Sequence, residues 1–137
     1  MNQIKIVLDT NVFISGIFFS GPPSEILKAW NKNKFQIALS KEILDEYKRV
    51  AYELSSKFPG VGILPIIKLI KTNGKFVDTQ HVEITVCEDP DDNKFIECAI
   101  ASDCEIIVSG DKHLLKLVAY EGISVLNPRD FVEKYLR

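Results

Sequence analysis

Residues 4–9 read IKIVLD, a short apolar run that is mostly β-branched and ends in an acid, Asp9. Such a run, with no polar alternation, is typical of a central parallel strand that is covered on both of its faces. The opening of the chain therefore predicts a buried parallel strand with a carboxylate at its carboxyl end.

Further along the chain, strands and helices alternate. Short apolar strands are predicted at 35–39, 105–109 and 123–126, and one or two extended pieces at 75–87. Apolar residues at helical spacing, with capping or breaking residues at the ends, predict helices from Ser24, over 41–54, from about 65 to 73, over 89–102, over 110–122 and from Pro128. This order predicts an α/β fold, with helices on both faces of one central parallel sheet in a three-layer α/β/α sandwich.

Length and composition restrict the class of protein. The 137 residues are the length of one domain, 1–137, and 46% of them are hydrophobic and 26% charged, which excludes whole-chain disorder. No apolar run approaches the ~20 residues of a membrane span, and the first residues do not resemble a secretory signal, so we expect a cytoplasmic protein. The spacing of the cysteines and histidines indicates neither a disulfide framework nor a zinc site: Cys87, Cys98, Cys104, His81 and His113. We interpret the three cysteines as buried thiols.

The charge is divided unevenly between two segments. Residues 25–75 contain 10 Lys or Arg and 5 Asp or Glu, a net charge of +5, whereas residues 76–111 contain 1 Lys and 10 acids, a net charge of −9. Such a concentration of acids destabilises a compact fold unless solvent or a cation neutralises it. Composition alone leaves two readings open, a solvated loop or a cation site.

Four acids are predicted to meet at one edge of the sheet. Asp9 ends the first strand and Asp111 follows the strand at 105–109 by one glycine, so both should emerge at the carboxyl ends of parallel strands. On a helical projection, Glu46 lies at the edge of the apolar stripe of the helix 41–54, and Asp92 lies on the buried side of the helix 89–102. Taken singly, each acid could equally be a helix cap or a surface residue.

A convergence of four carboxylates would favour a hard divalent cation. Clustered carboxylates repel one another unless such an ion binds them, and oxygen ligands without His or Cys point to Mg²⁺ or Mn²⁺. These ions polarise water and neutralise the charge that develops on a phosphate during displacement. The natural chemistry of such a site is phosphodiester hydrolysis.

Four segments, in order and spread over almost the whole chain, resemble the PIN-domain family: IVLDTNVFISG (6–16), SKEILDEY (40–47), DPDDNKFIECA (89–99) and IIVSGDKHLL (106–115). The resemblance implies an α/β/α nuclease that uses Mg²⁺ or Mn²⁺, with Asp9, Glu46, Asp92 and Asp111 as the catalytic and metal-binding acids. It also implies accessory polar roles for Asn11 and Ser109. Members of the family usually have Thr at the position of Ser109. The chain is most similar to the stand-alone, VapC-like members, many of which are ribonuclease toxins.

This resemblance leads to a functional hypothesis, a metal-dependent endoribonuclease that is the toxin of a type II toxin–antitoxin pair. RNA would be the substrate, an antitoxin protein a partner and a homodimer the expected assembly, with Lys48 and Arg49 as RNA-binding candidates. An RNA-processing housekeeping nuclease and a non-catalytic RNA- or protein-binding scaffold stay open as alternatives. The sequence also leaves open whether Asp89 or Asp91 shares the metal. A haloacid-dehalogenase-like phosphatase is disfavoured because Asn11 stands where that chemistry requires a second Asp.

Overall fold

The computed structural model describes residues 3–82, 90–115, 119–120 and 122–137. Its strands are β1 (Lys5–Leu8), β2 (Gln36–Leu39), β3 (Lys75–Phe76), β4 (Ile106–Val108), β5 (Ala119–Tyr120) and β6 (Ile123–Leu126). They form one sheet in the order β3-β2-β1-β4-β6-β5, in which β3, β2, β1, β4 and β6 are parallel and β5 is antiparallel to β6. The predicted central parallel sheet is therefore confirmed.

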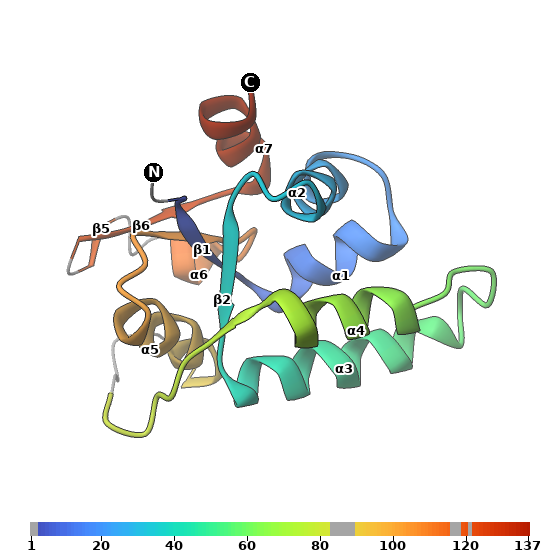
Figure 1. The fold of residues 1–137 in the computed structure, drawn as a ribbon, viewed down its shortest axis with the longest axis horizontal. Coiled ribbons are helices and arrows are strands. Elements are labelled where there is room, and N and C mark those ends of the chain that lie inside the picture. Colours follow the sequence, from blue (N-terminus) through green and yellow to red (C-terminus); the bar gives the residue numbers. More distant parts are fainter. Residues whose placement is uncertain (1–2, 83–89, 116–118, 121) are drawn as a thin grey trace.

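The helices are α1 (Thr10–Phe18), α2 (Pro22–Asn31), α3 (Lys41–Ser55), α4 (Leu64–Asn73), α5 (Asn93–Ala101), α6 (Lys112–Leu115) and α7 (Pro128–Phe131). A 3₁₀ turn (Pro90–Asp92) precedes α5, and a π turn (Val132–Leu136) extends α7. The connection from β1 to β2, which contains α1 and α2, and the connection from β3 to β4, which contains α5, cross the sheet in opposite directions. Because such crossovers are right-handed, α5 lies on the face opposite α1 and α2. Figure 1 shows β1 and β2 between α5 on one side and α1 and α2 on the other, which confirms the three layers.

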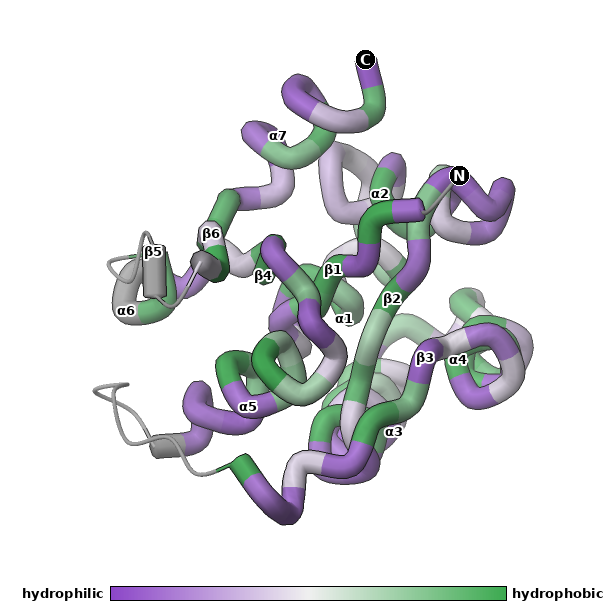
Figure 2. Tube along the Cα trace, turned by 60° about the vertical axis from the view of Figure 1, so that its left-hand side comes forward, coloured by the Kyte–Doolittle hydropathy of each residue, from purple (hydrophilic) through white to green (hydrophobic). Residues whose placement is uncertain are grey.

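Apolar side chains of the central strands form the core. Ile6, Val7 and Leu8 of β1 are fully buried, as are Ile107 and Val108 of β4, which explains why these strands show no polar alternation. Figure 2 shows the same contrast, with hydrophobic strands at the centre and hydrophilic positions along the outer sides of the helices. None of the helices in the described ranges combines the length and the apolar composition that crossing a membrane requires.

Helix α1 is an element that the sequence pattern did not predict. Its residues are mostly apolar or β-branched and lack a polar stripe, because α1 packs against both α2 and α3. Gly16 permits this packing: a Cβ at that position would lie 2.6 Å from Leu27 Cδ1 and 2.8 Å from the backbone oxygen of Pro23. A helix that is covered on several sides loses the periodicity that sequence analysis depends on.

The prediction of one helix over 110–122 is wrong. The structure has the short helix α6 in this region and then β5, which pairs with β6 through Tyr120 and Ile123. Gly122, which the sequence suggested as a helix stop, instead has a φ of 81° in the two-residue connection between the strands. Only a residue without a Cβ adopts this conformation at low cost, and it is typical of tight hairpins.

The connections between strands reverse direction between β1 and β4. From β1 the chain moves to β2 and then β3 on one side, whereas β4 and β6 lie on the other. A backbone hydrogen bond from Asp9 N to Val108 O (3.0 Å) joins the carboxyl ends of the two strands. In open α/β sheets this switch point is where ligands bind.

Candidate active site

Ser109 links two of the predicted acids at the switch point. It follows β4 directly, is fully buried, and its Oγ donates a hydrogen bond to Asp9 Oδ2 at 2.6 Å. The same Oγ accepts a hydrogen bond from the backbone N–H of Asp111 at 2.9 Å. The Ser109 hydroxyl therefore fixes the carboxylate of Asp9 relative to the backbone of Asp111, which carries the second acid.

Asp9 is a buried carboxyl group, with 5% of its surface exposed. Burial raises its pKa, the hydrogen bond from Ser109 and a backbone hydrogen bond at Asn11 oppose the rise, and the negative charges of Asp111 and Glu46 add to it. The charges of two carboxylates from other segments thus disfavour the ionised form of Asp9 at the carboxyl edge of the sheet. A buried carboxyl group with a raised pKa beside other acids is a feature of many functional sites.

Helix α3 brings Glu46 to the same edge. Ser40 caps this helix by accepting a hydrogen bond from Ile43 N, and Tyr47 anchors it by donating from its buried hydroxyl to Leu8 O at 2.5 Å. The Tyr47 ring also stacks on Phe13 of α1, with centroids 4.2 Å apart. Because Tyr47 holds α3 against the end of β1, the preceding residue, Glu46, lies at the margin of the site.

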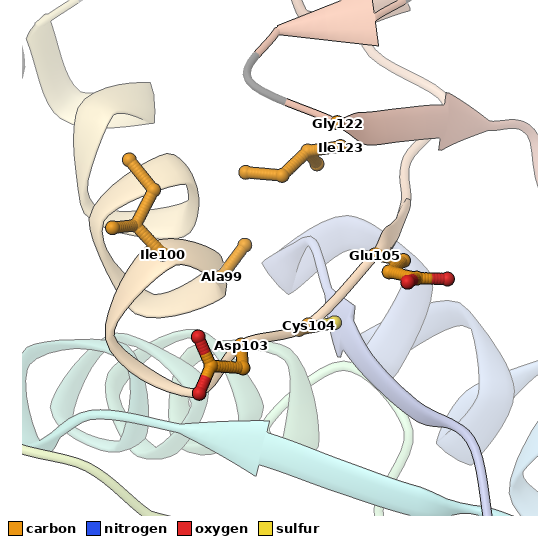
Figure 3. Close-up of a pocket in the computed structure, with 7 residues that line it drawn as sticks. All are labelled: Ala99, Ile100, Asp103, Cys104, Glu105, Gly122 and Ile123. Carbon is orange, nitrogen blue, oxygen red and sulfur yellow. The ribbon is translucent and has the colours of Figure 1, made fainter.

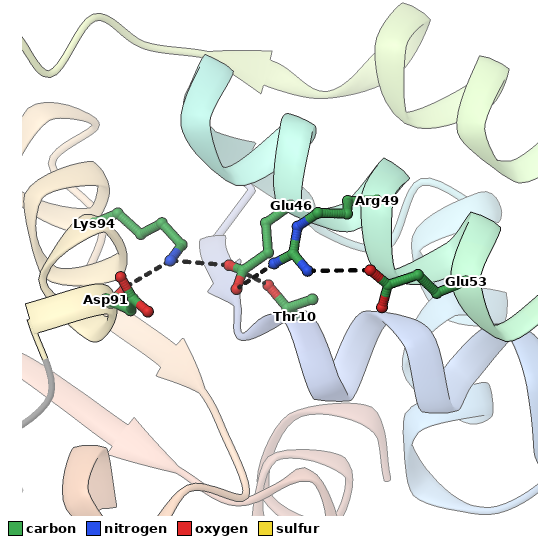
Figure 4. Close-up of polar contacts among 6 residues, drawn as sticks. All are labelled: Thr10, Glu46, Arg49, Glu53, Asp91 and Lys94. Atoms are coloured by element: carbon green, nitrogen blue, oxygen red, sulfur yellow. Dashed lines mark hydrogen bonds and ion pairs between the residues drawn. The ribbon is translucent and has the colours of Figure 1, made fainter.

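Every oxygen of Glu46 has a partner. Thr10 Oγ1 donates a hydrogen bond to Oε2 at 2.8 Å, and Lys94 Nζ forms an ion pair with the same oxygen at 3.0 Å. Arg49 Nη2 lies 3.9 Å from Oε1 and also pairs through Nη1 with Glu53 at 3.4 Å. Figure 4 shows Glu46 between Lys94 of α5 and Arg49 of its own helix.

Thr10 and Lys94 are site residues that the sequence analysis missed. Neither residue is an acid or a member of the basic segment 25–75, the two features from which the sequence predicts site residues. A signal for Lys94 exists in the sequence, since it is the single Lys within the acidic segment 76–111. A lone cation among ten acids is a reasonable candidate for a buried counter-ion.

Asp92 lies at the amino end of α5, as predicted, and is buried with 8% of its surface exposed. Its neighbour Asp91 is exposed and contributes its backbone carbonyl to Lys94 Nζ at 2.6 Å. Asp89 lies outside the described residues. The ion pair from Lys94 to Glu46 places the first turn of α5 beside α3, and the assignment of Asp92 as a metal ligand stays a prediction.

The remaining polar candidates are distributed around this edge. Asn11 is exposed at the start of α1, Lys48 is half-buried on α3, and Arg49 has 61% of its side chain exposed. By contrast, Lys32 and Lys34 precede β2 and lie at the amino edge of the sheet, far from the acids. Of the two RNA-binding candidates on α3, Arg49 contacts a predicted site acid, since its Nη2 lies 3.9 Å from Glu46 Oε1.

Two cavities near the start of β4 lie at the wrong end of the sheet for this chemistry. The larger, of about 400 Å³, is lined by residues that include Ala99, Asp103, Glu105 and Ile123. Figure 3 shows it between the last turn of α5 and the start of β6. Because Asp9 and Asp111 follow the carboxyl ends of β1 and β4, these hollows are separate from the candidate site.

The donor set suits a hard divalent ion, since Asp9, Glu46 and Asp111 supply only carboxylate oxygens. Across the described ranges, however, no three His, Cys, Asp or Glu side chains form a group that could hold a metal in the arrangement observed. In that arrangement Glu46 Oε2 contacts Lys94 Nζ and Thr10 Oγ1. The residue types fit Mg²⁺ or Mn²⁺, and Glu46 is bound to protein cations.

Comparisons with known proteins agree with this fold. A PIN-domain family model matches residues 5–113. The uncharacterized protein MJ1680 of Methanocaldococcus jannaschii is 31% identical over 97% of this chain and 92% of its own length. The crystal structure of VapBC2 from Rickettsia felis bound to a DNA fragment from their promoter matches with a TM-score of 0.60 at 15% identity, over 90% of this chain and 98% of the other.

The structure of the T. brucei RRP44 PIN domain matches with a TM-score of 0.50 at 14% identity, over 97% of this chain and 80% of the other. At such low identity the two solved structures establish the fold alone. The family model covers most of the chain, and the motifs that it spans include the four acids described above. The chain belongs to the PIN-domain family, a family of nucleases.

Proposed function

We propose that this protein is an endoribonuclease that requires Mg²⁺ or Mn²⁺. The observation that carries the proposal is Asp9, which Ser109 orients and whose pKa is raised by burial and, in addition, by the charges of Asp111 and Glu46. A bound divalent ion would supply water activation and neutralise charge on the phosphate that is attacked. Membership in a nuclease family supports the same reaction class.

In this proposal Asp9, Glu46, Asp92 and Asp111 would hold the ion, and their neighbours set their orientation. Ser109 fixes Asp9 relative to the backbone of Asp111, and Thr10 fixes Glu46. Pre-oriented carboxylates lose little conformational entropy when they bind a cation, so these two hydroxyls contribute to affinity without contacting the substrate.

Lys48 and Arg49 would bind the RNA backbone beside the acids. Both lie on α3, where Arg49 is one turn from Glu46 and largely exposed, and Lys48 is half-buried on another side of the helix. Phosphate contacts of this kind add salt-dependent affinity that is independent of sequence. Asn11, exposed at the start of α1, is the accessory polar group closest in sequence to Asp9.

We infer further that the nuclease is a toxin whose partner is an antitoxin, and that it forms a homodimer. The support is the fold shared over 90% of the chain with the VapBC2 structure. An RNA-processing housekeeping role is the alternative. Co-purification of a small DNA-binding protein encoded beside this gene would favour the toxin, and growth unaffected by expression of active protein would contradict it.

The decisive experiment measures RNA cleavage by purified protein with Mg²⁺ or Mn²⁺, and by the variants Asp9→Asn and Asp111→Asn. Loss of one ligand disrupts several catalytic effects together, so we expect each variant to lose at least about 100-fold in rate. Circular dichroism should show unchanged folding. Lys48→Ala and Arg49→Ala should instead weaken RNA binding and lower its salt dependence.

Two outcomes would reject the nuclease. Cleavage at the wild-type rate by Asp9→Asn would identify a contaminating ribonuclease. RNA binding without cleavage, over a broad panel of substrates and with either metal, would replace the enzyme with a binding scaffold.

A further inference from the structure

Lys94 is held in an unusually defined position for a lysine. Its side chain is 17% exposed, and Nζ contacts both Glu46 Oε2 (3.0 Å) and Asp91 O (2.6 Å). The ammonium also lies 5.1 Å from the centroid of the Phe95 ring. Lysines usually keep their ammonium group in water, so partial burial with three partners indicates a specific role.

The partner that matters is Glu46 Oε2, because this oxygen is also the one that Thr10 orients. An oxygen 3.0 Å from an ammonium cannot at the same time bind a divalent ion at about 2.1 to 2.6 Å without bringing two cations into strong repulsion. The two cations therefore compete for this carboxylate.

We propose that Lys94 is a built-in counter-ion of the candidate metal site, which neutralises Glu46 and competes with Mg²⁺ or Mn²⁺ for its carboxylate. The inference rests on the proposed function, because it assigns Glu46 to the metal. It adds that Lys94 lowers the metal affinity while stabilising the protein at low metal concentration. Lys94 is thus a positioning residue that acts through Glu46.

Replacing Lys94 distinguishes competition with the metal from a purely stabilising ion pair with Glu46. Lys94→Met removes the competing charge but keeps an apolar stem against Phe95. By calorimetry on protein stripped with EDTA, we expect this variant to bind Mn²⁺ about five- to tenfold more tightly than the wild type. Its melting temperature in EDTA should be lower, because the carboxylates are no longer neutralised.

Lys68→Met is the matched control, since Lys68 is exposed on α4 and its loss changes the net charge equally. This control should bind Mn²⁺ as the wild type does. Lys94→Arg, which keeps the positive charge, should retain wild-type affinity. In a Glu46→Gln background, Lys94→Met should no longer tighten Mn²⁺ binding, because the coupling runs through the carboxylate.

A wild-type protein that binds Mn²⁺ and cleaves RNA, together with unchanged or weaker binding by Lys94→Met, would overturn the role of Lys94 alone. A wild-type protein that binds no Mn²⁺ would overturn both this inference and the proposed metal-dependent nuclease. Should Lys94→Met fail to fold, Lys94→Gln retains a hydrogen-bond donor for Asp91 O and is judged by the same affinity criterion.

Discussion

At the scale of single residues, the candidate site is built from hydroxyl groups that hold acids in place. Ser109 bonds to Asp9 and to the backbone of Asp111, and Thr10 bonds to Glu46. Neither hydroxyl carries charge, so both orient the carboxylates, and the hydrogen bond from Ser109 also opposes the rise in the pKa of Asp9. The residues that relieve the repulsion among the acids are cations, and the balance between acids and cations sets the stability of this edge.

Asp9→Asn should raise the free energy of unfolding in EDTA at neutral pH. Burial and the charges of Asp111 and Glu46 raise the pKa of Asp9, so its ionised form is disfavoured in the folded state. Asn keeps an oxygen that accepts the hydrogen bond of Ser109 but carries no charge. Urea unfolding measures the change, with the exposed Asp45→Asn as control. A lower stability for Asp9→Asn would show that repulsion does not dominate here.

Cys98 and Cys104 should be unreactive thiols in the native protein. Burial raises the pKa of Cys98 to about 12 and that of Cys104 to about 11, so at pH 8 both are protonated. The thiolate is the reactive form, and unfolding returns both groups to an ordinary pKa. In a Cys87→Ser variant, Ellman's reagent should label neither thiol at pH 8 and two after denaturation. Rapid native labelling would contradict the burial of these groups.

At the scale of elements, the close approach of α1 and α2 depends on Gly16. Gly16→Ala should destabilise the protein by about 1 to 3 kcal/mol, because the added methyl group would meet the Pro23 carbonyl as well as Leu27. Gly60→Ala is the control, since a Cβ there meets nothing within 4 Å. Denaturant unfolding compares the two, and equal stability would mean that α1 can shift away from α2 at little cost.

Helix α3 has a second structural function beyond its apolar stripe. Tyr47 reaches from the helix to Leu8 O at the end of β1, and Glu46 precedes it in the chain. The residue that anchors the helix is therefore adjacent to the residue that faces the site. An error in the position of α3 would displace Glu46 directly.

At the scale of the whole molecule, Asp9 and Asp111 follow the carboxyl ends of two neighbouring parallel strands, and a divalent ion that binds only the folded state should stabilise it. Mg²⁺ or Mn²⁺ at a hundredfold excess over Kd should add about 2.7 kcal/mol to the free energy of unfolding. Thermal unfolding with and without metal measures the effect, and Zn²⁺ should not be required. An unchanged midpoint, with no metal binding detectable by calorimetry, would count against the site.

The apolar strand residues predicted the parallel sheet and the acids at the ends of its strands, and the capping residue Ser40 predicted where α3 begins. These features are local: the burial pattern of IKIVLD and the cap at Ser40 are properties of a few neighbouring residues. They allowed the positions of Asp9, Glu46 and Asp92 to be predicted from topology and helical phase. Their roles as metal ligands stay predictions.

Only the tertiary structure decided the features that depend on residues distant in the chain. The burial of α1 on several sides hid its periodicity, and the pairing of β5 with β6 overrode the helical pattern of 110–122. The pairing of Lys94 with Glu46, across 48 positions, and the bond of Ser109 to Asp9, across 100, have no local signature. Side-chain contacts between separate elements follow from how the layers pack, which no short stretch of sequence encodes.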